Sequence, residues 1–208
     1  MRVLHIIPAT FHYFDDIQSA AFTLVSNLEK LGVETGVFTL QYGGEGGALT
    51  TQSAVEKVTT GRRYGGTLSI TEALGTFSEY DVVHVHAPFL GAAGKIMAAK
   101  QASGVPMLLT IYRPVFTPDF FSLAIKLYNW YYLPRLCALA ETITVSSGQA
   151  IMARLPSIFR RFRDKMLEVD DTPNFVDPEV ERMLADPELN AEERLAIKYQ
   201  MVYNQFLP

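Results

Sequence analysis

The chain has 208 residues, of which 49% are hydrophobic and only 19% are charged. This balance is typical of a folded domain with a substantial core, and it excludes a disordered tail. The formal net charge of −4 excludes a uniformly basic surface for nucleic acid. The single cysteine, Cys137, excludes an internal disulfide framework and favours a cytoplasmic setting. Residues 1–8 are too short an apolar run for a secretion signal. Charged residues and a proline interrupt the apolar stretch 120–140, so no transmembrane helix is expected there.

Short apolar runs alternate with helical periodicity along the chain. A strand at 3–7, a helix at 17–31 that Gly32 ends and a strand at 33–40 form the first unit. The pattern continues with strands at 81–85, 105–111 and 142–145 and helices at 89–103, 120–140 and, capped by Ser147, up to 155. Glycine-rich segments between 41 and 81 are interpreted as loops around short elements, and the chain ends in a helix at 191–206. The alternation predicts a Rossmann-like, doubly wound α/β fold, with a mainly parallel sheet and helices on both faces.

In an open parallel sheet, ligands bind beyond the carboxyl ends of the strands, where backbone amides and helix N-termini converge. Four loops of this chain are expected at that edge, at 9–16, 86–90, 112–116 and 146–148. Their polar side chains are the candidate site residues. They are His12, Tyr13, Asp15, Asp16, His86, Tyr112, Arg113, Ser146 and Ser147.

Several of these candidates have a structural interpretation as well as a functional one. His84 and His86 are two apart on a predicted strand and so share a face; His84 is expected in the core and His86 at the strand end. No histidine follows His86, so no metal site is expected from this pair. Asp15 and Asp16 could serve as a general base or simply suit the positive end of a helix. Arg113 could bind an anionic group or form a salt bridge.

Two further stretches stand out by composition. Aromatic residues are concentrated between 116 and 132, where they favour core or domain contact over a membrane anchor. A basic run between 154 and 165 is typical of a solvated face, with phosphate binding as the alternative.

Five segments, in the same order, resemble the N-terminal half of a GT-B fold glycosyltransferase of family 4 (GT4). The segments are Met1-Arg2-Val3-Leu4-His5-Ile6-Ile7-Pro8, Tyr80-Asp81-Val82-Val83-His84-Val85-His86-Ala87-Pro88-Phe89, Gly104-Val105-Pro106-Met107-Leu108-Leu109-Thr110, Ala140-Glu141-Thr142-Ile143-Thr144-Val145-Ser146-Ser147 and Pro173-Asn174-Phe175-Val176-Asp177. They extend over nearly the whole chain.

The resemblance implies a retaining enzyme that moves a sugar from a nucleotide-sugar donor to a sugar or lipid-linked acceptor, in glycan or glycolipid synthesis. It implies a Rossmann-like acceptor-side domain at 1–175, and at 176–208 a linker and helix leading toward a donor-binding domain that this chain lacks. The fragment alone is then expected to be inactive, with no cofactor and no nucleic-acid partner. His86, Asp15 and Asp16 are the expected catalytic residues, and His12, Tyr13, Tyr112, Arg113, Ser146 and Ser147 the expected substrate-binding residues. The implied location is cytoplasmic, with peripheral contact at the inner face of the membrane as a further option.

The sequence departs from the family pattern at three places. Phe14-Asp15-Asp16 stands where the family has a Gly-Gly pair, and its bulk and negative charge oppose a diphosphate. Tyr112 replaces the histidine of a Thr-x-His motif, and Phe175 replaces a signature glycine. These departures keep open a non-catalytic α/β module that docks a protein or a membrane surface. A receiver-like or flavodoxin-like protein fits less well, because the acidic pair lies well beyond the first strand.

Overall fold

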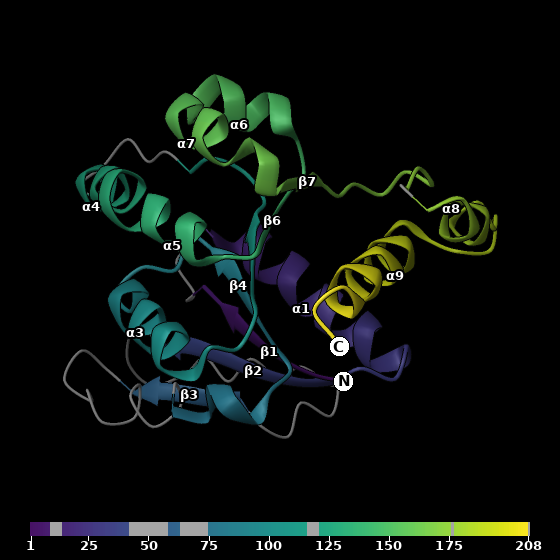
Figure 1. The fold of residues 1–208 in the computed structure, drawn as a ribbon, viewed down its shortest axis with the longest axis horizontal. Coiled ribbons are helices and arrows are strands. Elements are labelled where there is room, and N and C mark those ends of the chain that lie inside the picture. The colour runs from purple at the N-terminus through teal and green to yellow at the C-terminus, as the bar shows by residue number, and fades with distance from the viewer. Residues whose placement is uncertain (9–13, 42–57, 63–74, 116–120, 176, 208) are drawn as a thin grey trace.

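The computed structural model describes residues 1–8, 14–41, 58–62, 75–115, 121–175 and 177–207. In these segments seven parallel strands form one sheet in the order β3-β2-β1-β4-β5-β6-β7 (Figure 1). The strands are β1 Arg2–Ile7, β2 Glu34–Gln41, β3 Val58–Arg62, β4 Val82–Ala87, β5 Met107–Ile111, β6 Thr142–Val145 and β7 Met166–Glu168. The strand order reverses direction between β1 and β4, as in a doubly wound fold, so the predicted fold class is confirmed.

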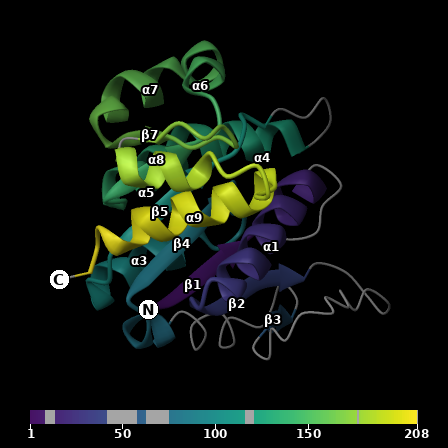
Figure 2. The ribbon, with the colours of Figure 1, turned by 90° about the vertical axis from the view of Figure 1, so that its right-hand side faces the viewer.

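Helices cover both faces of the sheet (Figures 1 and 2). On one face lie α1 (Asp15–Lys30) and α9 (Ala191–Asn204), which contact each other; α3 (Ala93–Ser103) and α5 (Leu133–Leu139) lie on the other. The remaining helical elements are α4 Phe121–Leu127, the π-helical turn η3 Tyr128–Tyr132, α6 Gly148–Arg154, α7 Pro156–Phe162, α8 Pro178–Leu184 and the 3-10 turns η2 Thr76–Glu79 and η4 Arg163–Lys165.

Local sequence signals account for several of the helix ends. Gly32, with φ of 81°, follows the end of α1 as predicted, since a left-handed residue there costs glycine little. The side-chain oxygen of Ser147 accepts a hydrogen bond from the amide of Ala150, which confirms the predicted cap of α6. Asn190 and Glu193 form a reciprocal capping box at the start of α9.

The structure changes three details of the predicted element map. The predicted helix 89–103 begins only at Ala93. The predicted helix 120–140 is one helical run that contains the π turn η3, followed by Pro134, which has no amide hydrogen to donate. The short strand β7 was not predicted, because three residues are too few to show a period.

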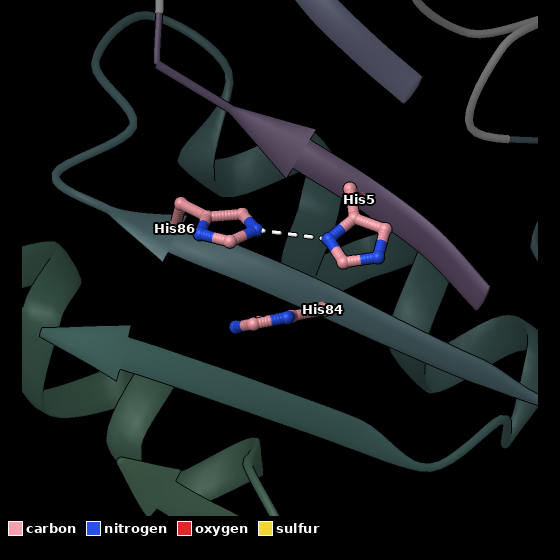
Figure 3. A group of neighbouring side chains, drawn as sticks. All are labelled: His5, His84 and His86. Atoms are coloured by element: carbon pink, nitrogen blue, oxygen red, sulfur yellow. Dashed lines mark hydrogen bonds between the residues drawn. The ribbon is translucent and has the colours of Figure 1, made fainter. Parts of the chain in front are cut away.

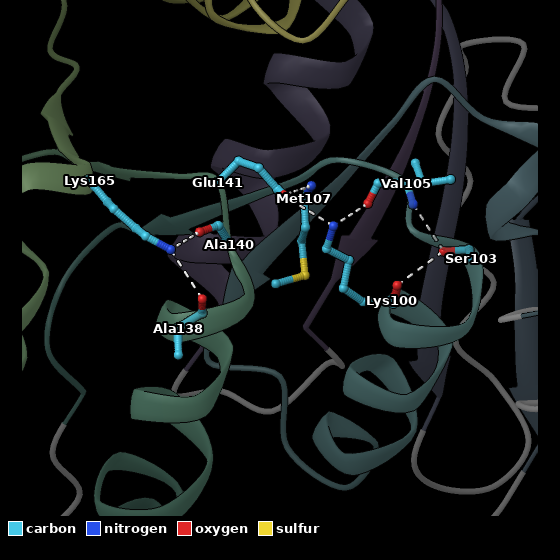
Figure 4. Close-up of polar contacts among 8 residues, drawn as sticks. All are labelled: Lys100, Ser103, Val105, Met107, Ala138, Ala140, Glu141 and Lys165. Atoms are coloured by element: carbon cyan, nitrogen blue, oxygen red, sulfur yellow. Dashed lines mark hydrogen bonds and ion pairs between the residues drawn. The ribbon is translucent and has the colours of Figure 1, made fainter.

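At the amino edge of the sheet, a set of buried and half-buried polar contacts ties neighbouring segments together (Figure 4). Lys100 of α3 donates to the carbonyl oxygen of Val105 at 2.7 Å and pairs with Glu141 at 2.8 Å. The other oxygen of Glu141 accepts from the amide of Met107 at 2.6 Å. Lys165 donates to the carbonyl oxygens that end α5. These contacts fix α3, β5 and the α5–β6 connection at the edge opposite to the expected ligand site.

Candidate functional site

An open cavity of about 560 Å³ lies between α1 and α9, at the carboxyl ends of β5, β6 and β7. This volume is in the range of small-molecule sites, and the position is the one expected for an open parallel sheet. The lining residues are Asp16, Ser19, Ala20, Thr23 and Leu24 of α1, Tyr112 and Ser146 at strand ends, Val169, Asp170 and Asp171 after β7, and Ala191, Glu192, Leu195 and Tyr199 of α9.

The wall of the cavity at α1 is held by an ion pair. Arg113 donates from Nε to one oxygen of Asp16 at 2.6 Å and from Nη2 to the other at 2.8 Å. This bidentate contact holds the pKa of the Asp16 carboxyl below its usual range and raises the pKa of Arg113. Arg113 therefore fixes the loop after β5 onto the first turn of α1, and Asp16 is a carboxylate at neutral pH.

The opposite wall is held by a second pair. Lys198 of α9 is almost fully buried and donates to the carbonyl oxygen of Asp170 at 3.0 Å and to its carboxylate at 3.1 Å. The hydroxyl of Thr172 and Lys198 both donate to that carboxylate and lower its pKa. A buried ammonium needs such partners, so Lys198 anchors α9 to the segment after β7.

Two tyrosine rings form the apolar part of the cavity. Tyr112 follows β5 and is half-buried, and Tyr199 of α9 is almost completely buried. The Tyr199 hydroxyl lies 3.2 Å from the hydroxyl of Thr110 and 3.3 Å from that of Thr144. Both threonines lie on the face of the sheet that α9 covers, so the strands themselves hold this ring in place.

Beneath the cavity, three buried histidines form a cluster (Figure 3). His5 Nδ1 and His86 Nε2 lie 3.0 Å apart, and His86 Nδ1 lies 2.8 Å from the Tyr112 hydroxyl. The His84 ring stacks on the His86 ring with centroids 4.0 Å apart. A hydrogen-bonded chain thus runs from His5 through His86 to the Tyr112 hydroxyl.

His84 is bonded at both nitrogens. His84 Nδ1 lies 2.7 Å from the Tyr203 hydroxyl of α9, and His84 Nε2 lies 2.6 Å from the hydroxyl of Thr110. His5 Nε2 is the buried side-chain polar atom that has no partner within the described residues. Burial lowers the pKa of His5 to about 3 and holds the pKa values of His84 and His86 well below the usual value. All three rings are therefore neutral at pH 7.

The ligand atoms of this cluster all lie within 4.8 Å of one another, a spacing that could in principle hold a metal ion. However, both nitrogens of His84 and of His86 take part in hydrogen bonds. The two rings are also stacked, so their in-plane lone pairs do not converge on one point. The cluster is better suited to supporting Tyr112 and α9.

The structure brings three of the sequence candidates to the cavity: Asp16, Tyr112 and Ser146. The expectation that His84 lies in the core is confirmed. His86 is also fully buried and lies behind Tyr112, so it does not line the cavity.

The other candidates lie around the cavity. Asp15 is exposed in the first turn of α1, Arg113 is held by Asp16, and Ser147 caps α6. His12 and Tyr13 lie outside the described residues.

Sequence reasoning missed the contribution of α9. Tyr199 and Lys198 come from this helix, and the acidic pair Asp170 and Asp171 comes from the segment after the unpredicted β7. One signal was present: Tyr199 and Tyr203 are four residues apart and so share a helical face. Two tyrosines on one face indicate an apolar contact that also carries hydroxyls.

Residues 17–153 match the model of Glycosyltransferase Family 4, which is about two thirds of the chain. The chain belongs to this family. A comparison with curated protein sequences gives no significant match.

Solved structures give the same fold at low sequence identity. An alpha-glucosyltransferase in complex with UDP-glucose and DNA has a TM-score of 0.54 at 10% identity, over 82% of this chain and 42% of that one. Anabaena HepE in complex with UDP also has a TM-score of 0.54, at 14% identity over 86% and 47%. S. aureus MnaA with UDP has 0.50, at 17% identity over 83% and 45%. The chain therefore spans less than half the length of these structures.

Proposed function

We propose that this chain is the acceptor-side lobe of a retaining hexosyltransferase, which moves a sugar from a nucleotide-sugar donor to a sugar or lipid-linked acceptor in glycan or glycolipid synthesis. The cavity at the carboxyl edge of the sheet carries the proposal. It combines two tyrosine rings with hydroxyl and carboxylate groups, and such a surface can both pack against a sugar ring and hydrogen-bond its hydroxyls.

Each cavity residue has a proposed role. Asp16, held in place by Arg113, accepts a hydrogen bond from an acceptor hydroxyl. Tyr112 and Ser146 bind the same sugar from the strand ends. His86 acts as a positioning residue, because it is bonded to the Tyr112 hydroxyl and has no contact with the cavity. In a retaining transfer the leaving diphosphate can take the acceptor proton, so no strong protein base is required.

The donor is proposed to bind mainly to a second lobe outside residues 1–208. The family membership and the neighbours that contain UDP or UDP-glucose support a nucleotide-sugar donor. The acidic first turn of α1 disfavours a diphosphate on this lobe. The two proposed parts of the chain remain 1–175 for the acceptor lobe and 176–208 for the connection, although α9 also packs on the sheet. The lone cysteine supports a cytoplasmic location.

Acceptor binding can be tested by saturation-transfer NMR with glucose, mannose and N-acetylglucosamine as probes. We expect transfer to at least one sugar, reduced several-fold in Ser146→Ala, which removes a cavity hydroxyl, and in Tyr112→Phe, which frees the Tyr112 ring from its hydrogen bond to His86. Ser157→Ala, an exposed hydroxyl on α7, is the matched control and should leave the signal unchanged. Equal transfer in all variants would contradict the assignment of the cavity.

Calorimetry with UDP-glucose and GDP-mannose tests the division between lobes. We expect these 208 residues to bind both nucleotide sugars very weakly, because most of the donor-binding site is proposed to lie on the second lobe. Tight binding would overturn that division. A coding sequence that continues past Pro208 into a second block of alternating strands and helices would support it.

A non-catalytic binding module is the second candidate. The Asp16–Arg113 pair favours it, since Asp16 stands in the segment where the family pattern has two glycines and is held there by Arg113. For this candidate, the cavity variants should leave every sugar signal unchanged and the coding sequence should end without a second lobe.

A further inference from the structure

Four exposed apolar side chains lie along one face of the helical run formed by α4, η3 and α5. They are Leu123, Leu127, Trp130 and Tyr131, at the spacing i, i+4, i+7 and i+8. Trp130 is 74% exposed and Leu123 is 68% exposed. These four residues, called the aromatic stripe below, leave an apolar helix face open to solvent, which a folded domain normally avoids.

The π turn helps to create the aromatic stripe. Tyr128 and Leu133 are five residues apart and both buried, while Trp130 and Tyr131 between them both point outward. Pro134 has no amide hydrogen, and Arg135 donates to the carbonyl oxygen of Tyr131 at 2.7 Å. The Arg135 guanidinium also lies over the Tyr131 ring, 3.7 Å from its centroid. The Tyr131 ring is therefore held by a side chain of the same helical run.

The segment that carries the aromatic stripe has a net charge opposite in sign to that of the whole chain. Residues 121–163 contain six lysines and arginines and a single acidic residue, Glu141, whose carboxylate is bound by Lys100 and the amide of Met107. Lys126 and Arg135 on the helical run and Arg160 on α7 are exposed. Residues 164–208, by contrast, contain eleven acidic and four basic residues. The α4–α7 sector and the α8–α9 sector lie on different sides of the molecule (Figures 1 and 2).

We infer that the aromatic stripe docks onto an anionic phospholipid bilayer. Tryptophan and tyrosine favour the boundary between headgroups and acyl chains, leucines add buried apolar area, and the exposed Lys126 and Arg135 on the same helical run match anionic headgroups. The contact is peripheral, since none of the helices in the described segments is long and apolar enough to cross a membrane. The inference uses neither the cavity nor a donor, so it does not depend on the proposed function.

Trp130 is the single tryptophan of the chain, so its fluorescence reports on the aromatic stripe without a label. The full chain is mixed with vesicles of phosphatidylcholine alone or of equal parts phosphatidylcholine and phosphatidylglycerol. We expect a blue shift of the emission and cosedimentation with the mixed vesicles only, both weakening as salt is added. An unshifted emission with the mixed vesicles would overturn the inference, and so would equal binding to both vesicle types.

Variants locate the contact. The double variant Leu123→Ser/Leu127→Ser keeps the tryptophan. We expect its affinity for the mixed vesicles to fall by about tenfold or more, because two apolar side chains no longer enter the bilayer. Lys126→Glu should weaken binding several-fold, mainly at low salt. Met183→Ser, at an exposed methionine on α8 in the acidic sector, is the control and should bind like the unchanged chain.

Two further results would overturn the inference. The first is wild-type binding by the double-serine variant with an unchanged circular dichroism melt. The second is concentration-dependent dimerisation without vesicles that the double-serine variant abolishes, which would assign the aromatic stripe to a contact between two copies.

Discussion

The two faces of the sheet differ in chemistry although both are buried. The face under α3 and α5 is packed with aliphatic and aromatic side chains. The face under α1 and α9 carries a layer of histidines and threonines that hydrogen-bond to tyrosines. Parallel sheets are usually apolar on both faces. One face therefore stabilises the fold by apolar packing, while the other also holds Tyr112 and Tyr199 at the cavity.

Acidification should reveal the largest difference between the two faces, because the buried histidines lie on the face under α1 and α9. Burial lowers the pKa values of His5, His84 and His86 in the folded chain, so below about pH 6.5 the unfolded chain binds more protons and stability falls. Each histidine that stays neutral costs about 1.4 kcal/mol per pH unit once the pH is well below 6.5; between pH 6.5 and 5.5 the loss is about 1 kcal/mol each, or about 3 kcal/mol for the three.

Denaturant unfolding at a series of pH values measures this loss. The carboxylates with lowered pKa values, Asp16 and Asp170, lose their contribution only at lower pH, so they do not blur this window. A free energy of unfolding that stays constant between about pH 7.5 and about pH 5.5 would show that the cluster accepts protons in the folded chain.

On the apolar face, Leu109→Ala should cost about 3 kcal/mol at neutral pH, because Leu109 is fully buried in the middle of β5 and leaves a cavity. Its cost should not change with pH. Leu123→Ala makes the same change at an exposed position and should shift stability by less than about 0.5 kcal/mol. Urea melts of both variants compare the two positions, and equal losses would refute this account of the core.

On the polar face, Tyr203→Phe should cost about 2 kcal/mol, since it leaves His84 Nδ1 buried without its partner. The aromatic ring and its packing against His84 are kept. Tyr131→Phe removes a hydroxyl from an exposed ring and serves as the matched control. If both variants unfold at the same urea concentration as the parent chain, the hydrogen bond between the Tyr203 hydroxyl and His84 contributes nothing to the packing of α9 on the sheet.

At the rim of the cavity, Arg113→Gln should cost less than about 1 kcal/mol, because both partners of the ion pair are exposed to solvent. Its clearer effect is electrostatic. The pKa of the Asp16 carboxyl should rise toward its usual value when the guanidinium is removed. An NMR titration of the carboxyl carbons follows this change, and an unmoved Asp16 would mean that Arg113 does not control its charge.

The sequence is sufficient to predict the five central strands and their carboxyl edge, because strand and helix periods are local, whereas the short edge strands β3 and β7 were not predicted. It placed Asp16, Tyr112 and Ser146 at the site for the same reason. Two contacts depend on distant parts of the chain and have no local signal. Arg113 pairs with Asp16 across 97 positions, and α9 covers His84 from 119 positions away. Strand alternation indicates that His84 and His86 share a face, but it does not say which helix covers them.

The hydrogen bonds of Glu141 with Lys100 and with the amide of Met107 lie at the amino edge of the sheet, opposite the cavity (Figure 4). The same strands are therefore anchored at one end and carry the cavity loops at the other. Loops at the cavity can accept insertions or new side chains while the contacts at the anchored end preserve the register of the strands. This separation allows the cavity loops to change their ligand without a matching loss of stability in the sheet.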